Sequence, residues 1–137
     1  MVIDETDNID YFLYKFNISK KDEKRIKIID NFFKEKIKSK IFSENNLNKI
    51  FYYKGKQAIN DILNFQIVKS KKNEVNLIEL RDHYKDRMIP KMPIGADFLM
   101  TKFNIEKGKL LGAKLKIIES EWVKNNFKIS DKKINYI

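Results

Sequence analysis

The residues whose types could support chemistry are few, and His83 is the first of them. It is the single histidine of the chain and lies between Asp82 and Asp86 in the segment LRDHYKD. Acid–base and metal chemistry both use histidine, but a histidine without a second pair of ligands is more typical of a surface or packing position. The two aspartates lie four residues apart among basic neighbours, a pattern that favours ion pairs along one helix face. The segment therefore gives weak support for a catalytic or metal site.

Other catalytic machinery is also missing from the sequence. The chain has no cysteine, which excludes disulfides, cysteine-ligated zinc and thiol catalysis. Two-metal phosphoryl transfer needs paired carboxylates, and the chain has no Asp-x-Asp pair, no glycine-rich phosphate loop and no Walker-type lysine motif. No serine or threonine has an evident base partner. The sequence predicts that this chain alone is not an enzyme and uses no metal and no cofactor.

The charge of the chain points instead to binding. With 29 basic and 19 acidic residues the formal net charge is +10, so the surface should attract polyanions, with nucleic acid as the first candidate. A compositional bias toward lysine, isoleucine and asparagine would produce the same charge without any binding role. Three basic clusters are candidate nucleic-acid contacts: Lys20, Lys21, Lys24 and Arg25; Lys54 and Lys56; and Lys107, Lys109 and Lys116.

Helices must position these residues, because apolar residues recur at helical spacing almost everywhere and no strand pattern is convincing. The expected fold is all-α, an irregular bundle of about six to eight helices. Ser19 and Ser43 are expected to cap two of them, and Asp97 a third. Gly55 is expected to be a hinge between two helices. The simplest division is one domain over residues 1–137, with a possible subdivision near 88–94.

Aromatic residues divide into expected core residues and expected surface residues. Tyr84, Phe103 and Trp122 lie on apolar helical seams and are predicted to pack in the core. Tyr11, Tyr52 and Tyr53 lie less clearly on such seams, so they are the better candidates for stacking on unpaired bases.

Three of the four glycines, Gly95, Gly108 and Gly112, fall within eighteen residues directly after Pro90 and Pro93. Two interpretations are open. The missing side chains of Gly108 and Gly112 could allow a neighbouring helix to cross closely. Alternatively, free amides at a helix start near Gly108, with lysines on either side, could hold a phosphate. The spacing alone favours helix packing.

Several motifs together resemble one protein family. They are the segment FNISKKDEKRI, the segment FYYKGKQAINDILN, and the series Pro93, Gly95, Asp97, Ile105, Gly108, Gly112, Leu115, Glu119 and Trp122. In this order they resemble the C-terminal body and tail of bacterial tRNA nucleotidyltransferases (CCA-adding enzymes) and their poly(A) polymerase relatives. Lys109 stands where that family usually has proline. The resemblance begins downstream of the family's catalytic head.

The resemblance implies a non-catalytic helical module that positions tRNA or another RNA, from a split or truncated family member. In the closing turn, Gly108 would form the turn and Gly112 would serve packing. A protein-interaction module that completes a separately encoded catalytic head is an alternative, as are a degenerate remnant and an unrelated binder of duplex DNA. The acidic N-terminal segment does not resemble a signal peptide, and no apolar run is long enough for a membrane span. A cytoplasmic location with no membrane partner is therefore expected.

Overall fold

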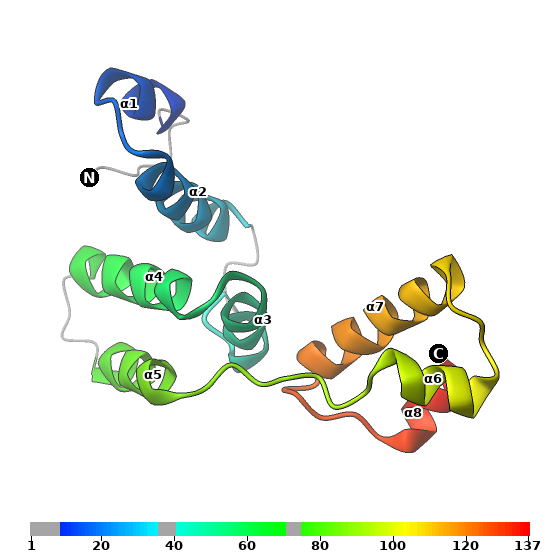
Figure 1. The fold of residues 1–137 in the computed structure, drawn as a ribbon. Coiled ribbons are helices and arrows are strands. Elements are labelled where there is room, and N and C mark those ends of the chain that lie inside the picture. Colours follow the sequence, from blue (N-terminus) through cyan, green and yellow to red (C-terminus); the bar gives the residue numbers. More distant parts are fainter. Residues whose placement is uncertain (1–8, 36–40, 71–74) are drawn as a thin grey trace.

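The computed structural model describes residues 9–35, 41–70 and 75–137, and it confirms the all-α prediction. These residues contain eight helices and no strand. The first five are α1 (Ile9–Lys15), α2 (Lys20–Lys34), α3 (Glu44–Lys54), α4 (Lys56–Lys69) and α5 (Val75–Asp86). Together they occupy one side of the molecule in Figure 1.

The last three helices form a second group. They are α6 (Ala96–Phe103), α7 (Lys109–Lys124) and α8 (Asp131–Tyr136). A non-helical segment, 87–95, connects α5 to α6 and crosses from the first group to the second in Figure 1. The possible subdivision near 88–94 falls within this segment.

Serine side chains begin several of these helices, as expected. Ser19 Oγ accepts a hydrogen bond from the Asp22 backbone N–H at 3.2 Å, and Ser43 Oγ accepts one from the Asn46 N–H at 3.4 Å. Such bonds satisfy amides that have no partner within the helix. The expectation that Asp97 caps α6 is wrong: Gly95 is the N-cap residue, and Asp97 lies in the first turn.

The apolar faces of the helices meet in two separate hydrophobic cores. The first lies among α2, α3, α4 and α5, and its buried members are Ile29, Phe32, Leu47, Phe51, Ile59, Ile62, Leu63, Leu77 and Tyr84. The second lies among α6, α7 and α8 and consists of Leu99, Leu111, Ile118 and Ile134. Helix α7 belongs to the second core, and its C-terminal half also packs on α3 (Figure 1).

Aromatic contacts join α7 to α3. Tyr52 Oη donates a hydrogen bond to Glu119 Oε1 at 2.5 Å, and the Tyr52 ring meets the Trp122 ring edge-on with centroids 5.5 Å apart. Phe127 packs on Trp122 at 5.0 Å. Burial, together with the hydrogen bond to Glu119, raises the pKa of Tyr52 to about 12. The hydroxyl is therefore neutral at physiological pH and remains a donor to Glu119.

A buried polar network centred on Asn48 reinforces this junction. The Asn48 side chain, fully buried, accepts hydrogen bonds from Tyr84 Oη at 2.8 Å and Arg87 Nη1 at 3.1 Å. Its Nδ2 donates to Asn126 Oδ1 at 3.1 Å. The Arg87 guanidinium also lies 5.2 Å from the Phe127 ring centroid. The Asn48 side chain thus links α3, α5, the start of the connecting segment and the turn after α7. Among the described residues, no buried side-chain polar atom lacks a hydrogen-bond partner.

Candidate nucleic-acid interface

The structure places the three predicted basic clusters in three separate regions. Exposed lysines of the first cluster lie in the first two turns of α2, whereas those of the third lie just before and along α7. The beginnings of α2 and α7 are at opposite ends of the molecule in Figure 1. The two sets are Lys20, Lys21 and Lys24, and Lys107, Lys109 and Lys116. They do not form one continuous surface.

Arg25 has a structural partner. Its Nε and Nη2 donate to the two carboxylate oxygens of Asp61, each at 2.9 Å, so that a bidentate pair joins α2 to α4. Gln57 also donates to Asp61, at 2.9 Å. Burial of the Asp61 carboxyl opposes its ionisation, but the hydrogen bonds from Arg25 and Gln57 outweigh burial and lower its pKa below the usual value. Because its guanidinium is held in this pair, we do not include Arg25 in the interface.

The glycine-rich stretch does not bring two backbones close together. A Cβ atom built at Gly95, Gly108 or Gly112 would meet no other atom within 4 Å, and Gly112 lies on the exposed side of α7. The expectation that Gly112 serves helix packing is therefore wrong. Gly108 is the N-cap residue of α7 with extended backbone, φ 166°, a conformation that any residue adopts.

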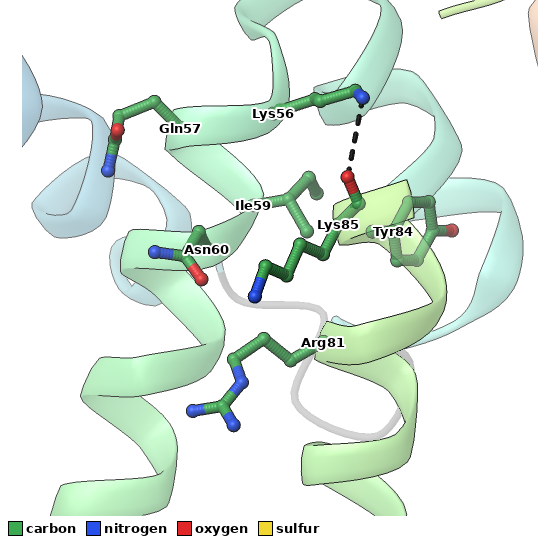
Figure 2. Close-up of a pocket in the computed structure, with 7 residues that line it drawn as sticks. All are labelled: Lys56, Gln57, Ile59, Asn60, Arg81, Tyr84 and Lys85. Carbon is green, nitrogen blue, oxygen red and sulfur yellow. Dashed lines mark hydrogen bonds between the residues drawn. The ribbon is translucent and has the colours of Figure 1, made fainter. Parts of the chain in front are cut away.

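Gly55 is the glycine whose backbone freedom the fold requires. Gly55 is both the C-cap residue of α3 and the N-cap residue of α4, which confirms the predicted hinge. Its φ of +93° lies in the left-handed region, where a side chain is strained. This sharp turn places Lys54 and Lys56 on either side of the helix junction and directs the first turn of α4 toward the last turns of α5 (Figure 2).

A pocket of about 210 Å³ lies where the start of α4 meets the end of α5. Figure 2 shows its lining, with the side chains of Arg81 and Lys85 directed from α5 into the space beside α4. The lining residues are Lys56, Gln57, Ile59, Asn60, Arg81, Tyr84 and Lys85. Ile59 and Tyr84 are buried and contribute apolar surface, while the others are polar or cationic. No aspartate or glutamate is among these lining residues.

Two of the three cationic side chains of this pocket donate hydrogen bonds to neutral partners. Arg81 Nη1 donates to Asn64 Oδ1 on α4 at 2.9 Å, and Lys56 Nζ donates to the Lys85 backbone carbonyl at 3.3 Å. The latter is one of the carbonyls that a helix end leaves without a helical partner. Two acidic side chains contact lining residues from outside the pocket: Asp82 Oδ1 lies 3.6 Å from Arg81 Nε, and Asp61 Oδ1 accepts a hydrogen bond from Gln57 at 2.9 Å. The guanidinium retains further N–H donors beyond these contacts.

The size of the pocket suits one anionic group. Bulk water occupies about 30 Å³ per molecule, so 210 Å³ accommodates a hydrated or directly bound phosphate. Pockets for drug-sized ligands are typically larger, roughly 300 to 1,000 Å³. Arginine offers planar paired donors to phosphate and lysine offers point charges. The three cationic side chains therefore give the pocket the charge and the donors that a phosphate requires.

Of these cations, only Lys56 is predicted from the sequence as a contact. The sequence around Arg81 and Lys85 favours ion pairs with the neighbouring aspartates instead, and the Arg81–Asp82 pair does form. A better sequence signal for the pocket is that Arg81 and Lys85 lie four residues apart on the helix that carries the buried residues Leu77 and Tyr84. That spacing places both cations at the edge of the face that α5 presents to α4.

Some of the remaining candidate residues are buried and others are exposed. Trp122 and Tyr84 are buried, as predicted, and Tyr53 and Tyr11 are exposed by 49% and 64%, so both remain available for stacking. The Tyr52 hydroxyl is bonded to Glu119. His83 is exposed and its ring lies edge-on to the Tyr84 ring. Within the described ranges, no group of three or more His, Cys, Asp or Glu side chains could hold a metal ion.

Comparison with known proteins adds no family. No protein-family model, curated protein or solved structure matches the chain. The resemblance to tRNA nucleotidyltransferases therefore rests on the sequence motifs quoted above. Across the residues that the structure describes, no helix is both long and apolar enough to cross a membrane.

Proposed function

We propose that this chain is a non-catalytic RNA-binding module that positions tRNA, or another structured RNA, through its phosphate backbone. The observation that carries the proposal is the pocket between α4 and α5, which Lys56, Arg81 and Lys85 line without an acidic lining residue. The net charge of +10 and the motif resemblance to the body and tail of tRNA nucleotidyltransferases support it. A cytoplasmic location belongs to the same proposal.

The binding mode follows from the chemistry of the pocket. One backbone phosphate occupies the pocket that these three residues line, and exposed lysines on α2 and α3 contribute longer-range attraction. Contacts with phosphate fix the register of an RNA on a protein but carry no sequence information. The module therefore distinguishes RNA by helical shape and charge spacing rather than by base sequence.

Titration of tRNA at two salt concentrations tests the proposal. If about six phosphates are neutralised, the affinity falls by roughly three orders of magnitude between about 50 and 200 mM salt. A tRNA without its 3′ end and a DNA duplex of similar length serve as competitors. Strong competition by duplex DNA would favour the unrelated DNA-binding function. Salt-insensitive binding, or no binding at low salt, would contradict the proposal, and a degenerate remnant would give the latter result.

A further inference from the structure

Helix α7 has apolar residues on two faces, and only one of these faces is covered. Leu111, Ile118 and Trp122 are buried against the rest of the protein. On the outer face Leu110 is 70% exposed and Ile117 is 50% exposed. Ala113 lies between them and is exposed as well. We refer to Leu110, Ala113 and Ile117 as the outer stripe.

The spacing of the outer stripe is that of a helix–helix seam. Residues 110, 113 and 117 follow one another at intervals of three and four, as the a, d and a positions of a heptad do. The small side chain of Ala113 leaves room for a larger side chain of a second helix between Leu110 and Ile117. The stripe spans about two helical turns, roughly 10 Å along the axis, and its spacing of three and four is complementary to that of a second helix.

Lysines occupy the positions that flank this seam. With residue 110 at position a, the adjacent e and g positions are filled by Lys109, Lys114 and Lys116. Lys109 and Lys116 are exposed, and Lys114 is partly exposed, with its Nζ 4.0 Å from the centroid of the Phe103 ring on α6. Residues at e and g set partner choice by charge. A helix with glutamates at its own e and g positions would pair with all three lysines.

The next flanking position marks the end of the seam. Glu121, one heptad after Lys114, is paired with Lys133 at 2.8 Å and with Lys124 at 3.7 Å. The hydrogen bond from Lys133 and the charge of Lys124 lower the Glu121 pKa below its usual value. This acidic group is therefore neutralised within the protein, and the local charge beside the stripe remains positive.

We propose that the outer stripe of α7 docks an acidic amphipathic helix of a partner protein. A second copy of this chain would place Lys109 opposite Lys114, which like-charge repulsion disfavours, and could offer Lys116 only Glu121, which is already paired with Lys133 and Lys124. RNA is disfavoured at the stripe itself because Leu110, Ala113 and Ile117 offer no aromatic ring for base stacking. The inference stands on α7 alone and does not depend on RNA binding at the α4–α5 pocket.

A designed peptide provides the probe. It is a three-heptad helix with leucine at positions a and d and glutamate at e and g, labelled for fluorescence anisotropy, and its control has lysine at e and g. The acidic peptide should bind the full chain saturably, and the basic one should not. The double substitution Leu110→Ser with Ile117→Ser should weaken binding at least about tenfold, because both apolar side chains lose their contacts.

Two further variants separate docking from simple charge attraction. Lys109→Glu with Lys116→Glu should switch the preference to the basic peptide, whereas Val68→Ser, at an apolar residue 85% exposed on α4, should change nothing. Circular dichroism confirms folding. Unchanged acidic-peptide binding by the Leu110/Ile117 variant would overturn the proposal, as would the absence of saturable binding. If the wild-type chain forms a dimer and the Leu110/Ile117 variant does not, the stripe binds a second copy. If the Leu110/Ile117 variant loses tRNA binding, the stripe binds RNA.

Discussion

Replacing Asn48 by leucine should destabilise the protein strongly, although leucine is apolar and similar in size. The substitution leaves Tyr84 Oη without its acceptor, and that side chain is only 2% exposed. A stranded buried donor costs about 1 to 3 kcal/mol. Arg87 and Asn126 also lose a partner, but both are only partly buried and can reach water, so they add about 1 kcal/mol together.

The expected cost is therefore about 3 kcal/mol in the free energy of unfolding, or about 10 °C in melting temperature for a chain of 137 residues. Urea and thermal unfolding followed by circular dichroism measure it. In the double variant with Tyr84→Phe no hydroxyl is stranded, so the double should cost about 1 to 2 kcal/mol less than the sum of the singles. Strict additivity, or a cost of Asn48→Leu below about 0.5 kcal/mol, would refute the role of the network.

Three further outcomes are expected. Arg25→Met should lower the free energy of unfolding by about 1 to 2 kcal/mol, a value reduced for solvent screening because the Arg25 side chain is 43% exposed. Urea unfolding at neutral pH measures this loss. An unchanged free energy would show that the bidentate pair with Asp61 does not stabilise the fold. The lowered pKa of Asp61 contributes stability that is fully present above a pH of about 4 and is lost as the pH falls further. In the Asp61→Asn variant the free energy of unfolding should therefore depend less on pH below about 4. The same loss of stability in acid as in the wild type would contradict this. Gly112→Ala should stabilise the protein by about 0.5 to 1 kcal/mol, because the site is helical and open. Gly55→Ala should destabilise it by about 1 kcal/mol because of the positive φ at this residue. Thermal unfolding compares the two, and a lower melting temperature for the Gly112 variant would show that a neighbouring backbone packs closely on Gly112.

Most of the fold could be predicted from local signals. The apolar spacing and the serine caps Ser19 and Ser43 specify helices that the structure confirms, because capping and amphipathicity act within a few residues. Helix α8, begun by Ser130, was not predicted, since its six residues offer too short a pattern. The division of the apolar residues between two cores was also not predicted, because it depends on how the helices pair in space.

The candidate site was predicted less well for the same reason. Lys56 was identified from its place beside Gly55, but Arg81 and Lys85 lie 25 and 29 residues further along the chain. They join Lys56 only because α5 packs on α4. The sequence also predicts Arg25 as an RNA contact, and its pairing with Asp61 across two helices is likewise a tertiary contact. Charge along a sequence thus shows where cations are, but not which of them converge.

Neutralising the pocket tests the central proposal most directly. The triple variant Lys56→Gln, Arg81→Gln and Lys85→Gln removes the three cations around one phosphate position, and its matched control removes three exposed charges on α2: Lys20→Gln, Lys21→Gln and Lys24→Gln. Binding of tRNA is measured against salt for both. The pocket variant should weaken affinity at least about tenfold and reduce the salt slope by about 1, with a smaller loss in the control. An equal or larger loss in the control would contradict phosphate binding between α4 and α5.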